Sequence, residues 1–203
     1  MKIDAHQHFW HYNPEEYAWI GDNMSLLKNN YLPAQLLPEL KSIGFDGSIA
    51  VQARQNYAET DWLLELASKN EFIKGVVGWV DLCNDSIGEQ LAKYAQNPKL
   101  VGVRHVVHDE PDDNFMARPD FQRGIGMLTN YGLTYDLLVF PKHLPLATEL
   151  VKKYPNQKFV LDHIAKPGIL KQLKEPWTAN IRALAKKQNV YCKLSGMVTE
   201  ADW

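Results

Sequence analysis

The sequence predicts a parallel α/β fold of the barrel type, and three observations lead to this prediction. Seven short runs rich in β-branched residues alternate with six helical segments along the 203 residues. Strict alternation of this kind is typical of a parallel sheet covered by helices. The glycine-rich turn of a dinucleotide-binding sheet is missing after the first strand, where the sequence reads HQHFWHYNP. The barrel is therefore favoured over the open, doubly wound sheet.

Each strand is predicted from a short apolar run that ends at polar or turn-forming residues. In chain order, the predicted strands are residues 3–9, 47–53, 76–82, 100–107, 133–139, 158–164 and 190–196. Helical spacing of apolar residues predicts the segments between them. These helices are residues 38–44, 57–70, 86–97, 120–132, 143–155 and 177–189.

Single residues set the ends and the strength of these helices. Pro38 is expected in the first turn of the first helix, and Gly44 just beyond its end. Asp85 is expected to cap the third helix. Gly124 and Gly126 are expected to weaken the fourth, because glycine has a low helix propensity.

The composition is that of an ordinary globular protein, with 45% hydrophobic and 23% charged residues. A net charge of −2 offers no basic surface for nucleic acid, and no apolar run is long enough for a membrane span. The N-terminus enters a polar strand at once, without the apolar core of a signal peptide. Cys83 and Cys192 fit no disulfide framework and are expected as buried thiols of a cytoplasmic protein. No heptad or repeat indicates an oligomeric state.

No linker or low-complexity tract divides the chain, so residues 1–203 are expected to form one barrel domain. Seven strands are one fewer than a closed barrel needs, and the chain is shorter than the roughly 250 residues typical of that fold. A sheet that does not close would leave two unpaired edges. We therefore expect the domain to be incomplete at its C-terminus, with a closing strand beyond Trp203.

Polar and titratable residues gather at the carboxyl ends of the predicted strands. Barrel enzymes carry their active sites at this end. In chain order these residues are His6, His8, Gln52, Arg54, Asp81, Arg104, His105, Tyr135, Asp136, Asp162, His163, Lys193 and Ser195. The opposite ends hold mostly glycines and polar loop residues, so an active site is predicted at the carboxyl ends.

The alternation of side chains along a strand decides which of these residues can meet. His6 and His8 point to the same side, so they could bind one zinc ion or form a structural pair. Of the neighbours Asp162 and His163, we expect His163 to face the site and Asp162 to face outward. Arg104 could polarise a carbonyl group or pair with an acidic residue.

Three further expectations concern the surroundings of the site. His105 should face away from it, next to Arg104, and Tyr135 and Lys193 could line either the site or the wall. The aromatic segment 9–20 should fold over the site. Its tryptophans and tyrosine could stack on a sugar ring or pack as a plug; they are Trp10, Tyr17 and Trp19.

Six motifs in this order resemble the amidohydrolase superfamily: DAHQHFW, GWVDL, GVRH, YDLL, DHIAKP and CKLSGMVTEADW. The resemblance runs from residue 2 to residue 203. Within the superfamily the chain resembles the sugar-lactone hydrolases, which include the L-fuconolactone and L-rhamnonolactone hydrolases. The resemblance implies a distorted (β/α)₈ barrel that binds a lactone and delivers water to its carbonyl group. It matches His6 and His8 to the first strand's pair, Arg104 to the fourth strand and His163 to the sixth.

The sequence also departs from the superfamily pattern. Binuclear members have a carboxylated lysine on the fourth strand and a histidine on the fifth. Here Arg104 stands near the first position and YDLLVF contains no histidine, so a two-metal site is not expected. The general base of the superfamily, an aspartate that ends the eighth strand, has no counterpart, because Asp202 lies too near the seventh strand.

The resemblance therefore implies an enzyme that hydrolyses a sugar-acid lactone, with Arg104 and His163 as catalytic residues. The residues expected to bind the substrate are His6, His8, Arg54, Tyr135 and Trp10. Two cofactor states stay open: one divalent metal such as zinc on His6 and His8, or none. Without a metal, histidines and Arg104 would donate hydrogen bonds to the carbonyl oxygen. The alternative functions are a metal-assisted decarboxylase of the same superfamily and an incomplete barrel that only binds a sugar acid.

Overall fold

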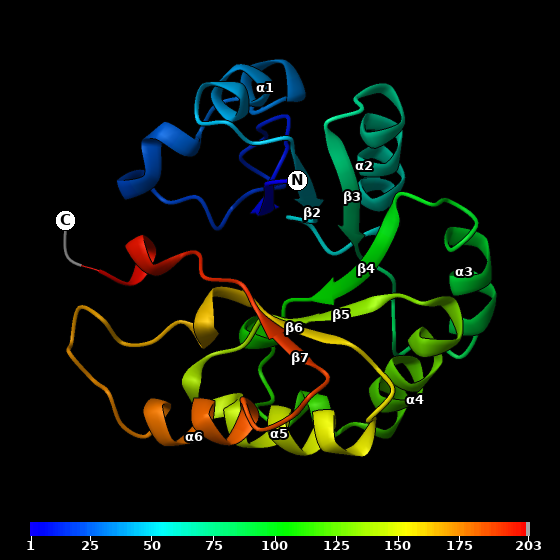
Figure 1. The fold of residues 1–203 in the computed structure, drawn as a ribbon, viewed down its shortest axis with the longest axis vertical. Helices are drawn as coiled ribbons and strands as arrows, with labels where there is room; N and C mark the ends of the chain where they lie inside the picture. Colours follow the sequence, from blue (N-terminus) through cyan, green and yellow to red (C-terminus); the bar gives the residue numbers. More distant parts are fainter. Residues whose placement is uncertain (202–203) are drawn as a thin grey trace. The chain divides into compact units, whose positions relative to one another are not determined.

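A computed structural model describes residues 1–201 of the chain, so Asp202 lies outside the described residues. Strands and helices alternate throughout, as predicted (Figure 1). The strands are β1 Ile3–Gln7, β2 Gly47–Val51, β3 Ile73–Gly78, β4 Leu100–His105, β5 Thr134–Leu137, β6 Phe159–Leu161 and β7 Val190–Cys192. The α-helices are α1 Pro33–Ser42, α2 Tyr57–Lys69, α3 Ile87–Tyr94, α4 Pro119–Leu128, α5 Leu144–Lys153 and α6 Trp177–Leu184.

Short 3₁₀ segments occupy several connections. They are η1 Asp22–Leu27, η2 Val107–Asp109, η3 Phe115–Ala117, η4 Thr129–Tyr131, η5 Pro141–His143, η6 Asp162–Ala165 and η7 Met197–Glu200. All seven strands of the described residues end earlier than predicted, because polar residues leave the ladder before the apolar pattern stops. His8 and Asp162 therefore lie just beyond their strands, where strict alternation no longer applies.

The strand order in the sheet follows the chain from β1 to β7, and the described pairings are parallel. The register places Arg104 of β4 opposite Asp136 of β5. It also places Leu161 of β6 opposite Cys192 of β7. These pairings bring the carboxyl ends of β4 to β7 to a common edge, which is the edge where the sequence predicts the chemistry.

The chain divides into two compact units. Unit 1 comprises residues 1–79 and 97–101, and it holds β1, β2, β3, the start of β4, α1 and α2. Unit 2 comprises residues 80–96 and the chain from Gly102 onward, with the rest of β4, β5 to β7 and the four remaining helices.

In unit 1, α1 begins five residues earlier than predicted. Pro33 occupies its first turn, where no N–H is needed, and the side chain of Gln35 accepts a hydrogen bond from the N–H of Leu32 at 2.8 Å. Pro38 therefore lies inside the helix, which corrects the predicted start. Gly44 follows the helix with φ +73°, as predicted for a residue in the left-handed region.

In unit 2, α5 and α6 lie side by side and α4 packs against β5 (Figure 1). Gly124 lets α4 pack closely: a Cβ atom there would lie 2.3 Å from the carbonyl oxygen of Leu82. Gly124 was predicted to weaken α4, but it is required for the close contact between α4 and the backbone of Leu82. The prediction that Asp85 caps α3 is wrong, because Ser86 is the N-cap residue and Asp85 instead accepts a hydrogen bond from Arg123 at 2.8 Å.

Two expectations about the surface can also be compared with the structure. Both cysteines are free thiols, but Cys192 is exposed on β7 and Cys83 is half-buried, so neither is the fully buried thiol predicted. Cys192 is exposed because β7 is an edge strand in the sheet order. Within residues 1–201, no helix is both long and apolar enough to cross a membrane.

Candidate active site

Unit 1 contains the histidine pair that the sequence predicts at the end of β1. The Nε2 atoms of His6 and His8 lie 3.2 Å apart, so the two imidazoles converge as the strand pattern predicts. The Nδ1 atom of His8 lies 2.8 Å from the carbonyl oxygen of Val51 on β2. A carbonyl can only accept, so this contact requires a proton on Nδ1 and leaves the lone pair of a neutral ring on Nε2.

This geometry fits a single zinc ion. Two imidazole nitrogens that bind one tetrahedral zinc at 2.0–2.1 Å lie about 3.3 Å from each other. The separation of 3.2 Å between the Nε2 atoms of His6 and His8 matches that value. The hydrogen bond from His8 to Val51 is also the outer-shell contact that orients a metal-binding histidine. His6 and His8 are therefore suited to hold one metal ion.

Arg54, predicted to bind substrate, is engaged by two carboxylates of unit 1. Its Nε donates to Glu59 at 2.5 Å, and its Nη1 lies 2.5 Å from Glu16. Its guanidinium also lies over the ring of Tyr17, 5.5 Å from the centroid. Glu59 is fully buried and accepts further hydrogen bonds from the backbone of residues 53 and 54. Arg54 thus links Glu16 of the aromatic segment to Glu59 near the turn after β2.

The aromatic segment packs as a plug around Trp10. This side chain is 5% exposed, and its indole N–H donates to the carbonyl oxygen of Asn29 at 2.8 Å. Tyr17 and Tyr31 pack against its ring. Trp19 meets Trp10 edge-on and is 50% exposed. The prediction that Trp10 offers a surface for a sugar is wrong, because its ring is covered; Trp19 is the exposed tryptophan of this segment.

Unit 2 contains a buried chain of four alternating charges. Arg104 Nη1 lies 3.0 Å from Asp162 Oδ2, and Lys193 Nζ lies 3.0 Å from Asp162 Oδ1. Lys193 also donates a hydrogen bond to Asp136. All four side chains are at most 9% exposed, so each needs the opposite charge beside it. Burial, followed by the charge of Asp162, raises the pKa of Asp136 to about 6, against the opposing effect of Lys193.

This cluster corrects the predicted orientation of Asp162. Strict alternation in a strand would turn Asp162 outward and His163 inward, as predicted from the sequence. Instead, β6 ends at Leu161, and Asp162 points to the same side as Arg104 and Lys193. The chain then enters a left-handed turn, which removes the strict alternation of a strand.

His163 begins that turn and is half-buried. Residues 163–166 all have positive φ, between 50° and 57°. The Nδ1 atom of His163 lies 2.9 Å from the hydroxyl oxygen of Ser195, which follows β7. Burial lowers the pKa of the His163 imidazole, and the nearby Asp162 carboxylate opposes that effect. The imidazole of His163 is therefore neutral at neutral pH. Its ring is held by Ser195, which follows the neighbouring strand β7.

Tyr135 and His105 lie on the opposite side of the sheet from Arg104. The ring of Tyr135 is fully buried against Phe121 of α4 and Phe159 of β6. The prediction that Tyr135 binds substrate is therefore wrong, because its side chain belongs to the layer between sheet and helices. His105 stacks on Phe115 in the same layer, at 4.7 Å between ring centroids, and so faces away as predicted.

Asp136 and Ser195 stand at strand ends, but no role for them was predicted from the sequence. Their signal is the spacing of polar residues inside apolar strands, as in YDLL and CKLSG. A charged residue in such a run must face an opposite charge, which points to Lys193 as the partner of an aspartate. The partner itself could not be chosen, because the register between strands is not visible in one sequence.

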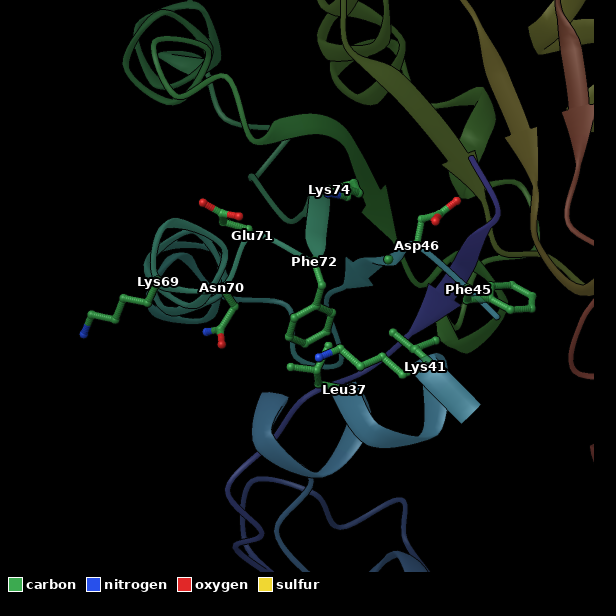
Figure 2. A pocket seen from close by; sticks show the side chains of 11 residues that line it. Leu37, Lys41, Phe45, Asp46, Lys69, Asn70, Glu71, Phe72 and Lys74 are labelled. Atoms are coloured by element: carbon green, nitrogen blue, oxygen red, sulfur yellow. The ribbon is translucent and has the colours of Figure 1, made fainter. Parts of the chain in front are cut away.

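A cavity of about 510 Å³ in unit 1 lies beside the amino ends of β2 and β3. Figure 2 shows Phe72 and Leu37 facing each other across it, while the side chain of Lys69 extends away. The histidine pair is not among its lining residues. The cavity therefore has no part in the candidate active site.

Comparison with known proteins identifies the class of protein. The family model described as Amidohydrolase matches residues 3–203, so the chain belongs to the amidohydrolase family. The chain is 41% identical to an L-fucono-1,5-lactonase of Burkholderia multivorans over 209 residues, which cover all of this chain and 70% of the relative. It is 36% identical to an L-fucono-1,5-lactonase of Burkholderia ambifaria, covering 99% of this chain and 69% of that protein.

Solved structures agree on the fold. A crystal structure of an amidohydrolase from Burkholderia multivorans with bound zinc is 42% identical and matches with a TM-score of 0.94. The match covers all of this chain and 72% of that one. A protein from Bordetella bronchiseptica described as a TIM-barrel protein is 8% identical, with a TM-score of 0.59 over 96% of this chain and 75% of that one, which bears on fold alone. The predicted α/β fold of the (β/α)₈ barrel type is thus confirmed.

Proposed function

We propose that this protein hydrolyses a 1,5-lactone of a sugar acid, of which L-fucono-1,5-lactone is the first candidate. The observation that carries the proposal is the identity of 41%, over the whole chain, to a curated L-fucono-1,5-lactonase. The strand-end residues supply the groups that such a reaction needs. The proposed location is the cytoplasm, where a reducing environment keeps Cys83 and Cys192 as thiols.

In this reaction, water adds to the lactone carbonyl carbon, and the bond from that carbon to the ring oxygen breaks. The products are a hydroxyl group and a carboxylate, with one proton released. Negative charge develops on the carbonyl oxygen in the transition state, so donors and cations directed at that oxygen accelerate the reaction. Arg104 carries such a permanent charge at the end of β4.

His163 is proposed to donate a hydrogen bond to the carbonyl oxygen of the lactone, where negative charge develops. Burial lowers the pKa of this imidazole, so the neutral ring can donate from one of its nitrogens. The proton of the attacking water passes to the ring oxygen as that oxygen leaves. Lys193 and Asp162 fix the strand ends around His163 and take no proton in this scheme.

His6 and His8 are proposed to bind the carbonyl end of the same lactone, since the carboxyl ends of parallel barrel strands form one active-site face. They would do so directly or by holding one zinc ion, which supplies Lewis acidity to the carbonyl oxygen when bound. The neutral tautomer of His8 and the separation of 3.2 Å between the Nε2 atoms support either role. Trp19 is proposed to contact the sugar, because its ring is exposed.

The test is a hydrolysis assay on several lactones, with acid release followed by a pH indicator. L-Fucono-1,5-lactone should be hydrolysed faster than D-glucono-1,5-lactone after subtraction of the uncatalysed rate. Replacing His163 with glutamine should abolish most of the activity, while Ser68→Ala, a hydroxyl deletion on the surface of α2, should not change it. Addition of a chelator distinguishes the zinc-bound scheme from direct binding. Equal rates for the parent and His163→Gln on every lactone would refute the proposal.

A further inference from the structure

The buried charges of unit 2 connect strands that are not neighbours in the sheet. Arg104 on β4 contacts Asp162, which follows β6, although β5 lies between these strands. Lys193, which follows β7, contacts Asp136 on β5, although β6 lies between them. Two strand spacings amount to about 10 Å, a distance that the long side chains of arginine and lysine can bridge. The two contacts therefore tie β4 to β6 and β5 to β7.

Lys193 is the residue that joins these two ties. Its Nζ atom lies 3.0 Å from Asp162 Oδ1 and also donates a hydrogen bond to Asp136. Its backbone N–H donates to the carbonyl oxygen of Leu161 at 2.9 Å, which fixes the base of its side chain beside the end of β6. The ammonium group is buried between two carboxylates, so its position and theirs depend on each other.

Asp162 connects the position of Lys193 to that of Arg104. Its Oδ1 atom faces Lys193, and its Oδ2 atom lies 3.0 Å from Nη1 of Arg104. The last torsion of an aspartate side chain has a broad intrinsic range, so the neighbours of the carboxylate decide its orientation. A cation on each oxygen holds the fully buried carboxylate of Asp162 in one orientation. The guanidinium of Arg104 is thereby held as well.

We propose that Lys193 is a positioning residue for Arg104 and that it acts through Asp162. The inference rests on the proposed function, in which Arg104 stabilises the negative charge that develops on the lactone carbonyl oxygen. This stabilisation is greatest when the donor is oriented before the reaction begins. Asp136 completes the cluster, because two cations and two carboxylates leave no net charge in the buried interior.

The first test measures the side chain of Arg104 and needs no substrate. In protein labelled with the heavy nitrogen isotope in arginine, the side-chain N–H signal of Arg104 is assigned by its loss in Arg104→Met. Lys193→Met should shift this signal and make its exchange with solvent at least about tenfold faster. Lys69→Met, which removes a lysine paired with Glu65 on the surface of α2, should leave the signal unchanged. An identical signal and exchange rate in Lys193→Met and the parent would overturn the proposal.

The second test separates positioning from charge balance. Lys193→Met leaves the two buried carboxylates with one cation of the cluster, so it should lower both stability and kcat. The double variant Lys193→Met with Asp136→Asn removes one charge of each sign and leaves Arg104 paired with Asp162. It should regain much of the stability, while kcat stays about tenfold or more below the parent value and KM changes less than about twofold. A double variant that regains kcat together with stability would show that Lys193 only balances charge, and it would refute the positioning role.

The two tests separate failure of this inference from failure of the proposed function. If the parent hydrolyses no lactone, the proposed function fails, and the arginine spectra still decide whether Lys193 orients Arg104. If Lys193→Met does not fold, the double variant takes its place in the first test, because its remaining charges are paired. An Arg104 signal and exchange rate in the double variant that match those of the parent would then overturn the inference.

Discussion

Arg104 and Asp162 form an ion pair that is almost completely buried, with 3.0 Å between Nη1 and Oδ2. Asp162 also contacts Lys193, so one carboxylate is shared by two cations from different strands. A buried charge that loses its partner is far more costly than a surface charge in the same situation. Arg104 therefore has a structural role beside the catalytic role proposed for it.

Replacing Arg104 with methionine should lower both activity and stability. The free energy of unfolding should fall by about 3–5 kcal/mol, because Asp162 keeps only one of its two cations. On sequence grounds alone a smaller effect on stability than on rate would be expected, and burial is the reason to revise that expectation. kcat/KM should fall by roughly 10²-fold or more if the guanidinium stabilises the developing oxyanion.

Arg118→Met is the matched control for this change. Arg118 pairs with Asp120 on the surface, where its side chain is 47% exposed. Loss of such a pair should cost less than about 1 kcal/mol. Urea unfolding of both variants checks the comparison. Equal losses of stability in the two variants would show that burial of the Arg104 pair has no special cost.

His108 should make the protein less stable in weak acid. Its ring stacks on Phe140 with 4.6 Å between centroids, and burial lowers its pKa to about 4. The unfolded chain takes up a proton near pH 6.5, whereas the folded chain resists protonation until about pH 4. Stability is therefore fully present above pH 6.5 and falls as the pH decreases toward 4, by at most about 3 kcal/mol.

The check is the free energy of unfolding at several pH values for the parent and for His108→Gln. The parent should lose more stability than the variant between neutral pH and pH 5, because the variant has no imidazole at this position. Parallel curves for the two proteins would contradict the assignment to His108.

The histidine pair should bind no more than one zinc ion per chain. The Nε2 atoms of His6 and His8 converge on one position, and the sequence has an arginine on β4 where a two-metal site would need a further ligand. Zinc titration followed by elemental analysis checks the stoichiometry. His8→Gln should weaken zinc binding by at least about tenfold, and His11→Gln, a histidine on the neighbouring loop, should leave it unchanged. Two equivalents of metal per chain would contradict the prediction.

Trp10 and Trp19 should respond differently to replacement with alanine. Trp10 is buried, so Trp10→Ala should lower stability by about 3–5 kcal/mol. Trp19 is half-exposed, so Trp19→Ala should leave stability within about 1 kcal/mol of the parent value and raise KM for the lactone. Thermal unfolding and steady-state kinetics of the two variants test this. A raised KM with intact stability in Trp10→Ala would reverse the two roles.

The periodicity of the sequence predicted the fold well because apolar runs and capping residues are local signals. The seven strands and six α-helices of residues 1–201 overlap the predicted segments, although every strand is shorter than predicted and α1 begins five residues before its predicted start. Alternation predicted the convergence of His6 and His8, and the two rings do converge although His8 lies just beyond β1. The orientation of Asp162 did not, because a left-handed turn without glycine gives no signal in the sequence.

The burial of Trp10 and Tyr135 also could not be predicted from the sequence. The sequence pattern does not distinguish an aromatic residue whose ring faces a ligand from one whose ring packs against a helix. Tyr135 packs against Phe121, which is distant in sequence and was not paired with it in advance. The partners of Arg54 were hidden for the same reason, since Glu16 and Glu59 lie on different segments.

The measurement that tests the central claim most directly is hydrolysis of L-fucono-1,5-lactone in water enriched in the heavy oxygen isotope. The account predicts an open-chain acid with one heavy oxygen in its carboxylate, formed much faster by the parent than by His163→Gln. Isotope incorporation at the carboxylate shows that water attacks the carbonyl carbon, and the variant shows that His163 takes part. Release of carbon dioxide, or equal rates of incorporation in the parent and the variant, would contradict the account.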